Sequence, residues 1–242
     1  MAKAANTAKT FIKDVIVFLF IFMVFTAFGY QSFHIPSGSM EPTLEVGDRV
    51  FVSKFSYGYS KYSLPFDPPV GQWRIFEDAP KRGDVAVFTD PKQNGGTDLI
   101  KRVIGLPGDR IQMIEGRLYI NGDMVERTFV REVSYTNYRG MDYTVSEYDQ
   151  TLPNGVTFRI YEHSDHDMLD ETSLIVVPQG HYFMMGDNRD QSADSRSSLG
   201  PIPMEQMVGR AEVTTFSLYD CDQGKDISCT MGIPFGRFFK GL

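Results

Sequence analysis

Two serines stand on a turn punctuated by proline and glycine, directly after a long apolar stretch. The turn reads Ile35-Pro36-Ser37-Gly38-Ser39-Met40-Glu41-Pro42-Thr43-Leu44. A serine hydroxyl is a weak nucleophile and attacks a carbonyl only when a neighbouring base takes its proton. If Ser39 carries out such chemistry, the chain must also supply that base.

Lys101 is the stronger candidate for this base. It lies within the apolar run Leu99-Ile100-Lys101-Arg102-Val103-Ile104, which has the composition of a strand. On the solvent-facing side of a strand, a lysine stays protonated and has no catalytic role. A lysine turned toward apolar side chains loses hydration, so its pKa falls and its neutral amine can take the serine proton. The spacing alone agrees with both orientations.

The histidines offer a different base, so a Ser-His-Asp triad stays open. The chain has four, His34, His163, His166 and His181. Five residues of extended turn do not readily bring His34 to Ser39. The pair at 163 and 166 lies among aspartates, but we interpret that stretch as a solvated loop because no third ligand stands at a defined spacing. We therefore expect no metal and no cofactor.

The elements that must position these residues begin with an N-terminal apolar stretch. Residues 15–30 include no charged side chain and follow Lys3, Lys9 and Lys13. The run is slightly shorter than the ~20 residues that cross a membrane as a helix, and snorkelling of Lys13 can extend it. Lysines before the run and none soon after it predict a cytoplasmic N-terminus and an exported remainder.

A cleaved secretory signal is the alternative to this anchor. Ala27 and Gly29 have the spacing of a small-x-small cleavage site, but the length of the apolar run favours an anchor. In either case the remainder is exported. Cys221 and Cys229 could then form a disulfide, although two reduced thiols stay possible.

Composition and charge narrow the class of protein. With 42% hydrophobic and 23% charged residues, the chain can bury a sizeable core. The formal net charge is -7, and no cluster of basic residues provides a phosphate-binding surface. Nucleic acid is therefore not an expected partner.

Beyond the turn, short runs rich in β-branched and aromatic residues alternate with turn signals such as Pro107-Gly108 and Asn121-Gly122. We predict strands over 49–55, 84–89, 99–104, 110–114, 117–120, 124–133, 156–161, 173–177, 182–185 and 208–218. The predicted fold class is mainly β: a single N-terminal transmembrane helix, an antiparallel β-sheet catalytic domain and a smaller β-rich inserted domain. The expected units are 1–32 for the cytoplasmic N-terminus and anchor, 33–115 with 172–216 for the discontinuous core, 116–171 for the insert and 217–242 for a tail.

Four segments, in this order behind an apolar N-terminal stretch, carry a family resemblance. They are Ser37-Gly38-Ser39-Met40-x-Pro42-Thr43-Leu44, Arg82-Gly83-Asp84-Val85-x-Val87-Phe88, Lys101-Arg102-Val103-x-Gly105-Leu106-Pro107-Gly108-Asp109 and Gly186-Asp187-Asn188-Arg189-Asp190-x-Ser192-x-Asp194-Ser195-Arg196. Together they resemble the four sequence boxes of bacterial type I signal peptidases, the leader peptidases of the Ser-Lys class. The resemblance covers the anchor and about 33–121 and 177–216. It is silent on 130–171 and on the tail.

The resemblance implies a membrane-bound serine endopeptidase that removes signal peptides from exported preproteins after small-x-small (A-x-A) sites. In the family pattern Ser39 is the nucleophile and Lys101 the general base. The Ser37 hydroxyl and the Ser39 backbone N–H form the oxyanion hole, which stabilises charge on the scissile carbonyl. Ser192 matches the serine that orients the lysine amine.

The resemblance also assigns supporting and substrate-binding residues. Asp194 and Arg196 match residues that hold the last box together. Shallow apolar pockets that admit small side chains are expected from Phe33, Ile35, Pro36, Met40, Leu44, Leu99 and Ile100. The expected partners are the signal peptides of secretory preproteins and the lipid bilayer. The expected location is the bacterial inner membrane, with a single pass and the catalytic domain on the extracytoplasmic side.

Two other functions stay open. One is a related Ser-Lys peptidase that matures proteins of a conjugation or secretion system. A self-cleaving repressor of the same fold is disfavoured, because an apolar anchor stands where its DNA-binding domain would be. The other is a non-catalytic, membrane-tethered β domain that binds peptides. That function would explain the anchor and the strands, but it leaves Ser37, Ser39 and Lys101 without a purpose.

Overall fold

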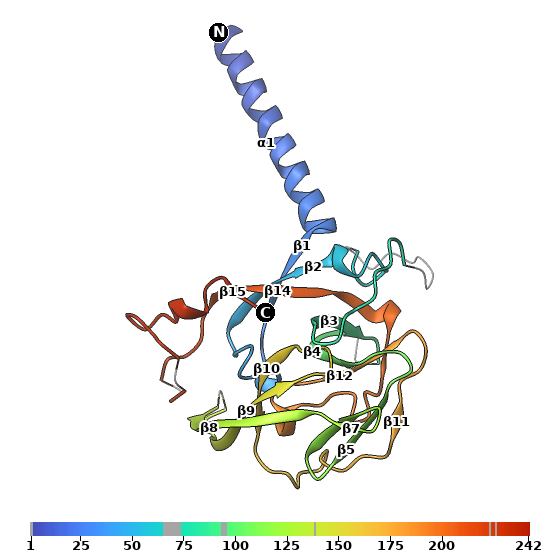
Figure 1. Cartoon of the computed structure of the whole chain (residues 1–242). Coiled ribbons are helices and arrows are strands. Elements are labelled where there is room, and N and C mark those ends of the chain that lie inside the picture. The colour runs from blue at the N-terminus through green and yellow to red at the C-terminus, as the bar shows by residue number, and fades with distance from the viewer. Residues whose placement is uncertain (1, 65–73, 93–95, 138, 223, 226) are drawn as a thin grey trace.

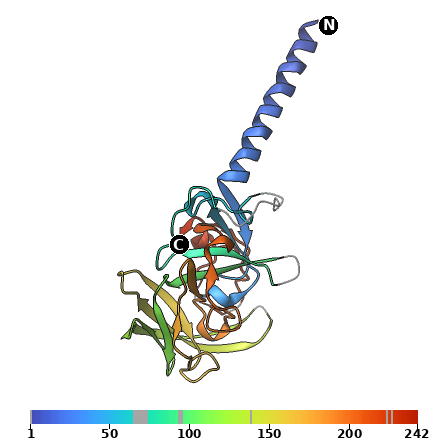
Figure 2. The ribbon, with the colours of Figure 1, turned by 90° about the vertical axis from the view of Figure 1, so that its right-hand side faces the viewer.

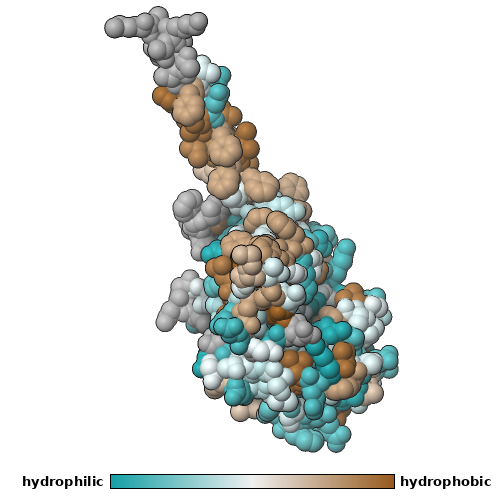
Figure 3. Space-filling view, turned by 90° about the vertical axis from the view of Figure 1, so that its left-hand side faces the viewer, coloured by the Kyte–Doolittle hydropathy of each residue, from teal (hydrophilic) through white to brown (hydrophobic). Residues whose placement is uncertain are grey.

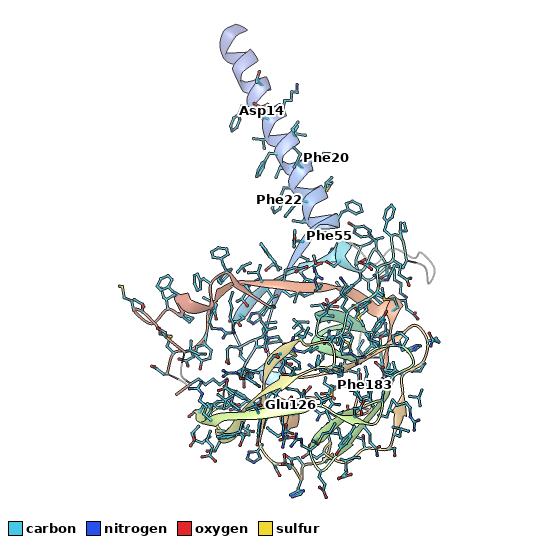
Figure 4. The ribbon with its side chains drawn as sticks, in the orientation of Figure 1. Asp14, Phe20, Phe22, Phe55, Glu126 and Phe183 are labelled. Atoms are coloured by element: carbon cyan, nitrogen blue, oxygen red, sulfur yellow. A yellow bond between two sulfur atoms is a disulfide. The ribbon has the colours of Figure 1, made fainter. Side chains whose placement is uncertain are left out.

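A long helix projects from a β-rich body in the computed structural model (Figures 1 and 2). The structure describes residues 2–64, 74–92, 96–137, 139–222, 224–225 and 227–242. The helix is α1 (Ala2–Phe28), and its segment Thr10–Phe28 is long and apolar enough to cross a membrane. Phe20 and Phe22 extend from the helix clear of the body (Figure 4), and the described part of the helix surface is mostly hydrophobic (Figure 3). The predicted anchor is therefore a continuous helix that is not packed into the core.

The C-terminal end of α1 is capped by side chains of the β body. The Tyr59 hydroxyl donates a hydrogen bond of 2.7 Å to the Phe28 carbonyl, and Lys54 Nζ lies 3.5 Å from the Ala27 carbonyl. The backbone N–H of Lys54 also donates to Gly29. These bonds satisfy carbonyl groups that a helix end leaves without partners, so the helix is fixed to the body at its exit.

The largest sheet carries two of the four segments that resemble the family boxes, and the other two follow strands of this sheet as turns. Among the described residues it has eight strands in the order β1-β2-β14-β3-β4-β12-β13, with β15 paired to β14. The neighbouring pairs are antiparallel. Its strands are β1 (Tyr30–His34), β2 (Asp48–Ser53), β3 (Val85–Asp90), β4 (Thr97–Gly105), β12 (His181–Met185), β13 (Ile202–Pro203), β14 (Met207–Ser217) and β15 (Lys240–Gly241).

Two smaller antiparallel sheets lie at the end of the body away from α1 (Figures 1 and 2). One has the order β11-β5-β6-β7 and the other β10-β9-β8. Their strands are β5 (Arg110–Ile114), β6 (Arg117–Ile120), β7 (Asp123–Met124), β8 (Glu126–Thr136), β9 (Asp142–Thr151), β10 (Thr157–Glu162) and β11 (Ile175–Val176). A buried apolar cluster joins both sheets to the large one through residues such as Ile104, Ile111, Ile160 and Phe183. Of these, Phe183 is labelled in Figure 4.

Short 3-10 helices form several of the connections. They are η1 (Gly38–Met40), η2 (Lys54–Ser56), η3 (Arg189–Gln191), η4 (Met204–Gln206) and η5 (Phe235–Arg237). Within the C-terminal segment, a disulfide joins Cys221 to Cys229. Contacts that attach this segment to the body include a buried ion pair between the Arg237 guanidinium and Asp48, at the start of β2.

The mainly β class predicted from the sequence is confirmed, and the predicted strands agree with the observed ones to within a few residues at most ends. Two of the longer strands were not predicted. β1 continues the chain directly from the helix, and β9 lies in the polar segment where only a weak strand was expected. The expected boundary between 115 and 116 falls inside the β5–β6 hairpin, where Ile114 pairs with Arg117. The division into units otherwise stays a prediction.

Candidate active site

Ser39 lies in η1, the single 3-10 turn that follows β1. The turn is held at both ends by backbone bonds: Glu41 N–H donates to the Gly38 carbonyl, and Leu44 N–H donates to Met40. Met40 and Leu44 are fully buried in the core between β1, β2 and β3. These apolar anchors fix the turn, and they leave the Ser39 side chain 8% exposed at the edge of a cavity.

Lys101 reaches Ser39 from the middle of β4. Its Nζ donates a hydrogen bond of 2.7 Å to Ser39 Oγ and lies 3.0 Å from the Ile100 carbonyl. The period of two in a strand places Lys101 on the same face as Leu99 and Val103, which pack against an apolar cluster. The orientation that the sequence left open is therefore inward, and the residue is only 4% exposed.

Burial lowers the pKa of Lys101 to about 8, because the interior solvates the ammonium poorly. The negative charges of Asp194 and Asp187 act in the opposite direction and are the smaller effect. Near pH 8 a large fraction of this lysine is a neutral amine. Such an amine can accept the Ser39 proton across the observed hydrogen bond.

A cavity of about 300 Å³ opens beside the two side chains. The turn and β4 form one part of its wall, and the tip of the β8–β9 hairpin forms another. The described lining contains no histidine and consists of Ser37, Gly38, Ser39, Glu41, Leu99, Lys101, Tyr135, Asn137, Arg139, Met141, Tyr143, Asn188, Gln191 and Ala193. The polar segment of 130–171, whose role the sequence left undetermined, therefore contributes directly to the cavity wall.

The backbone of the serine turn is clamped by Asn188. The Asn188 N–H donates to the Ser39 carbonyl at 3.2 Å, and its side-chain Nδ2 donates to the Gly38 carbonyl at 3.1 Å. The Gly38 carbonyl and the Ser39 N–H belong to one planar trans peptide unit and point in opposite directions. Fixing the Gly38 oxygen therefore fixes the direction of the Ser39 N–H, while Ser37 stands exposed on the cavity wall.

An ion pair joins the segment before Asn188 to β4. Arg102 donates two hydrogen bonds to Asp187, of 2.9 and 2.7 Å, and both side chains are buried. The Thr43 hydroxyl donates to the same carboxylate at 2.5 Å. Bidentate pairs of this kind combine strength with a defined geometry. Arg102 and Asp187 therefore hold the serine turn, β4 and the 186–196 segment in register.

Asp194 and Arg196 form the second buried pair of this segment, at 2.9 Å and with both side chains inaccessible to solvent. Asp194 also accepts the Gly186 N–H at 3.0 Å. The Ser192 hydroxyl is buried but has no hydrogen-bond partner among the described residues. The bond that was expected to orient the Lys101 amine is therefore not formed in this structure.

The residues expected to form substrate pockets separate into two groups. Leu99 lines the cavity. Ile35, Met40 and Leu44 are instead at most 2% exposed in the core beneath the turn, so they support the site and do not face a ligand in this structure. Phe33, Pro36 and Ile100 retain partial or full exposure around the serine turn and β4, although they are not part of the described cavity wall.

An acidic cluster includes one residue of the 186–196 segment, and it could not be recognised from the sequence. Oxygen atoms of Glu162, Asp170 and Asp190 lie within 4.8 Å of one another. The charges around them include two guanidinium groups: Arg127 Nη1 is 3.2 Å from Glu162, and Arg189 interacts electrostatically with the same carboxyl. These arginines compensate much of the negative charge of the cluster.

Burial raises the pKa of Glu162 to about 8, which makes the folded state favour the neutral carboxyl. The neutral Glu162 carboxyl contributes to the free energy of unfolding. This contribution is fully present below the ordinary pKa of a glutamate carboxyl and is lost as the pH rises through about 8. Replacing Glu162 by glutamine should remove this dependence. We expect the free energy of unfolding to fall more steeply for the wild type than for Glu162→Gln between about pH 6 and about pH 9. Urea denaturation followed by circular dichroism measures both curves, and parallel curves would contradict the assignment.

Comparison with known proteins places the chain in a family. The model for signal peptidase, peptidase S26, matches residues 8–216. The signal peptidase I of Rickettsia bellii (strain OSU 85-389) is 38% identical over 256 residues, which cover 98% of this chain and 86% of the relative. That of Rickettsia akari (strain Hartford) is 43% identical over 195 residues, covering 77% and 71%.

A solved signal peptidase I from Enterococcus faecalis V583 aligns with 55% of this chain and 97% of its own, at 27% identity and a TM-score of 0.33. Family membership follows from the match of residues 8–216 and from the coverage of the Rickettsia relatives. The chain therefore belongs to the signal peptidase family, peptidase S26, and its apolar N-terminal helix makes it a membrane-anchored member.

Proposed function

We propose that Ser39 and Lys101 are the catalytic dyad of this serine endopeptidase, and that it removes signal peptides from exported preproteins. The observation that carries the proposal is the 2.7 Å hydrogen bond between Ser39 Oγ and Lys101 Nζ. It joins a potential nucleophile to a buried amine whose pKa is lowered to about 8. A base must lie within hydrogen-bond reach of the proton that it removes and must be unprotonated at the working pH.

In the acylation step, Ser39 Oγ attacks the scissile carbonyl while the neutral Lys101 amine takes the serine proton. The carbonyl oxygen becomes an oxyanion, and the Ser39 N–H with the Ser37 hydroxyl donates hydrogen bonds to it. When the intermediate collapses, the C–N bond breaks and the Lys101 ammonium gives its proton to the leaving amine. The products are the mature protein with a free N-terminus and a signal peptide esterified to Ser39.

Deacylation repeats these roles with water. Lys101, neutral again, takes a proton from a water molecule as the water attacks the ester carbonyl. The same donors stabilise the second oxyanion, and the Ser39 oxygen leaves with the proton returned by Lys101. Ser192 is proposed to orient the amine during this cycle, and Asp194 with Arg196 to hold the segment that carries it. No step needs a metal ion.

The substrate is proposed to bind as an extended strand that pairs with the enzyme backbone. Leu99 in the cavity wall, with Phe33, Pro36 and Ile100 around it, would contact the residues before the cut. A cavity of about 300 Å³ that is shared by several substrate residues favours small side chains at the contact positions. This agrees with cleavage after a small-x-small sequence.

The membrane topology is part of the proposal. The helix Thr10–Phe28 would cross the bacterial inner membrane once, with the N-terminus in the cytoplasm and the β body on the extracytoplasmic side. Signal peptides emerging from that membrane would then be the partners, together with the lipid bilayer. No role is proposed for nucleic acid, since the net charge is -7.

The test uses the full chain in detergent micelles and a preprotein with an A-x-A site, in the presence of EDTA. We expect a single cut after the second alanine, identified by the mass of both products. A matched preprotein with phenylalanine directly before the cut should react at least about tenfold more slowly, because the pocket cannot accept the ring. Absence of cleavage, or equal rates for the two preproteins, would contradict the proposed specificity.

A further inference from the structure

Lys225 is buried against the serine turn, although it comes from the C-terminal segment. Its Nζ lies 2.7 Å from Glu41 Oε1 and 2.6 Å from Glu45 Oε2. The ammonium also lies over the ring of Tyr135, 4.2 Å from the centroid. Both ion pairs are nearly inaccessible to solvent. A buried charge pair is costly to break, because the remaining partner is left in the interior without compensation.

Glu41 connects Lys225 to the backbone of the serine turn. Its second carboxylate oxygen, Oε2, accepts hydrogen bonds from the Tyr135 hydroxyl at 3.0 Å and from Asn188 Nδ2 at 3.3 Å. The same Asn188 Nδ2 donates to the Gly38 carbonyl at 3.1 Å. One amide group is thus held between the carboxylate of Glu41 and the peptide unit whose opposite end is the Ser39 N–H.

The disulfide restricts the loop that carries Lys225. Cys221 and Cys229 are joined on either side of it in the sequence, with a separation of eight residues. A closed loop of this length has few conformations in comparison with a free C-terminal segment. A covalently restricted loop therefore holds Lys225 beside the two glutamates. The sequence alone predicted no role for Lys225 or for the disulfide.

We propose that Lys225, held by the Cys221–Cys229 disulfide, is a positioning residue that fixes the oxyanion hole through Glu41 and Asn188. The inference rests on the proposed function, because it assigns the Ser39 N–H to that hole. Lys225 does not touch the reacting atoms. It holds the Glu41 carboxylate in place, and Glu41 orients the Asn188 amide that sets the direction of the Ser39 N–H.

The experiment measures kcat and KM for preprotein cleavage by the full chain and by its variants. Lys225→Met and Glu41→Met should each lower kcat about tenfold with KM unchanged, since a hydrogen bond made only in the transition state is weakened. Lys225→Arg keeps the charge and should stay within about threefold of the wild type. The double variant Glu41→Met with Lys225→Met should be no slower than Glu41→Met alone, because the two residues act through one contact.

Glu45→Gln is the matched control. Glu45 contacts Lys225 as closely as Glu41 does, but the Asn188 amide bonds to Glu41 and not to Glu45 among the described contacts. We expect its kcat to stay within about twofold of the wild type. Equal losses of kcat for Lys225→Met and Glu45→Gln would mean that Lys225 only stabilises the fold, which would overturn the inference.

The kinetics of Lys225→Met and Ser39→Ala separate the positioning role of Lys225 from the proposed function. Wild-type kcat in Lys225→Met overturns the inference, and so does a rise in KM without a fall in kcat. If Lys225→Met fails to fold, Glu41→Met still tests the pathway, because Lys225 keeps Glu45 as its partner there. Cleavage by a Ser39→Ala variant would refute the proposed function itself. Loss of cleavage in Ser39→Ala, together with unchanged kcat in Lys225→Met, would refute the positioning role alone.

Discussion

Replacement of Ser39 by alanine, or of Lys101 by methionine, is expected to lower kcat for preprotein cleavage by roughly four orders of magnitude. Ser39→Ala removes the atom that is proposed to form the ester. Lys101→Met retains most of the apolar stem, which packs beside Leu99 and Val103, but removes the amine that lies 2.7 Å from Ser39 Oγ. Because the two groups act as a unit, the double variant should be no slower than either single variant.

The dyad also predicts the pH dependence of the wild type. The pKa of Lys101 is lowered to about 8, so the fraction of neutral amine, and with it kcat/KM, should rise as the pH passes through about 8 from below. The residual activity of Lys101→Met should lack this rise. Circular dichroism and retention in the membrane fraction serve as controls for folding. A wild-type profile that is flat from acid to alkaline pH would count against lysine as the base.

Gly186→Ala is expected to reduce kcat by about a hundredfold, although residue 186 provides no reacting group. A Cβ at this position would lie 2.4 Å from the Ser39 carbonyl oxygen and 2.3 Å from Ser192 Oγ. Real Cβ atoms do not approach other atoms so closely, so the serine turn or the 186–196 segment must move. A shift of the nucleophile of about 1 Å away from the base is enough for a loss of this size.

Gly236→Ala is the control for this substitution. A methyl group on Gly236 would have no atom within 4 Å, and the residue does not have a positive φ, so the same change should leave kcat and stability unaltered. Thermal unfolding of both variants separates displacement of the site from loss of the fold. Wild-type kcat in Gly186→Ala would mean that the close contact between the 186–196 segment and the turn is not needed for activity.

Much of the fold could be predicted because its signals are local. β-branched runs and turn dipeptides predicted strands such as Arg110–Ile114 and Arg117–Ile120 at their observed ends. The position of Lys101 was also accessible in part. Its neighbours in the strand are apolar at alternate positions, which makes an inward lysine conceivable, but only the sheet decides which face is buried.

What could not be predicted depends on contacts between distant segments. β9 is polar even at buried positions, where Glu147 pairs with arginines and Gln150 accepts a hydrogen bond from Arg189, so it lacks the composition of a buried strand. Glu41 has no local feature that distinguishes it from an exposed glutamate. Its partners Tyr135, Asn188 and Lys225 are between 94 and 184 residues away, and only the folded chain brings them together.

The junction between α1 and β1 has a consequence for which proteins can be cut. The helix end is bonded to Lys54 and Tyr59, and β1 continues from it as a paired strand, so the path from the membrane to Ser39 is stiff. Five residues of strand span ~17 Å. If the helix spans the bilayer as proposed, Ser39 stays at a fixed height above it, and one extra helical turn in a passing apolar segment moves the cut site of that segment by ~5 Å. Under the proposed topology, this fixed height would exclude the longer membrane-spanning segments of resident proteins, even where they contain two well-spaced alanines.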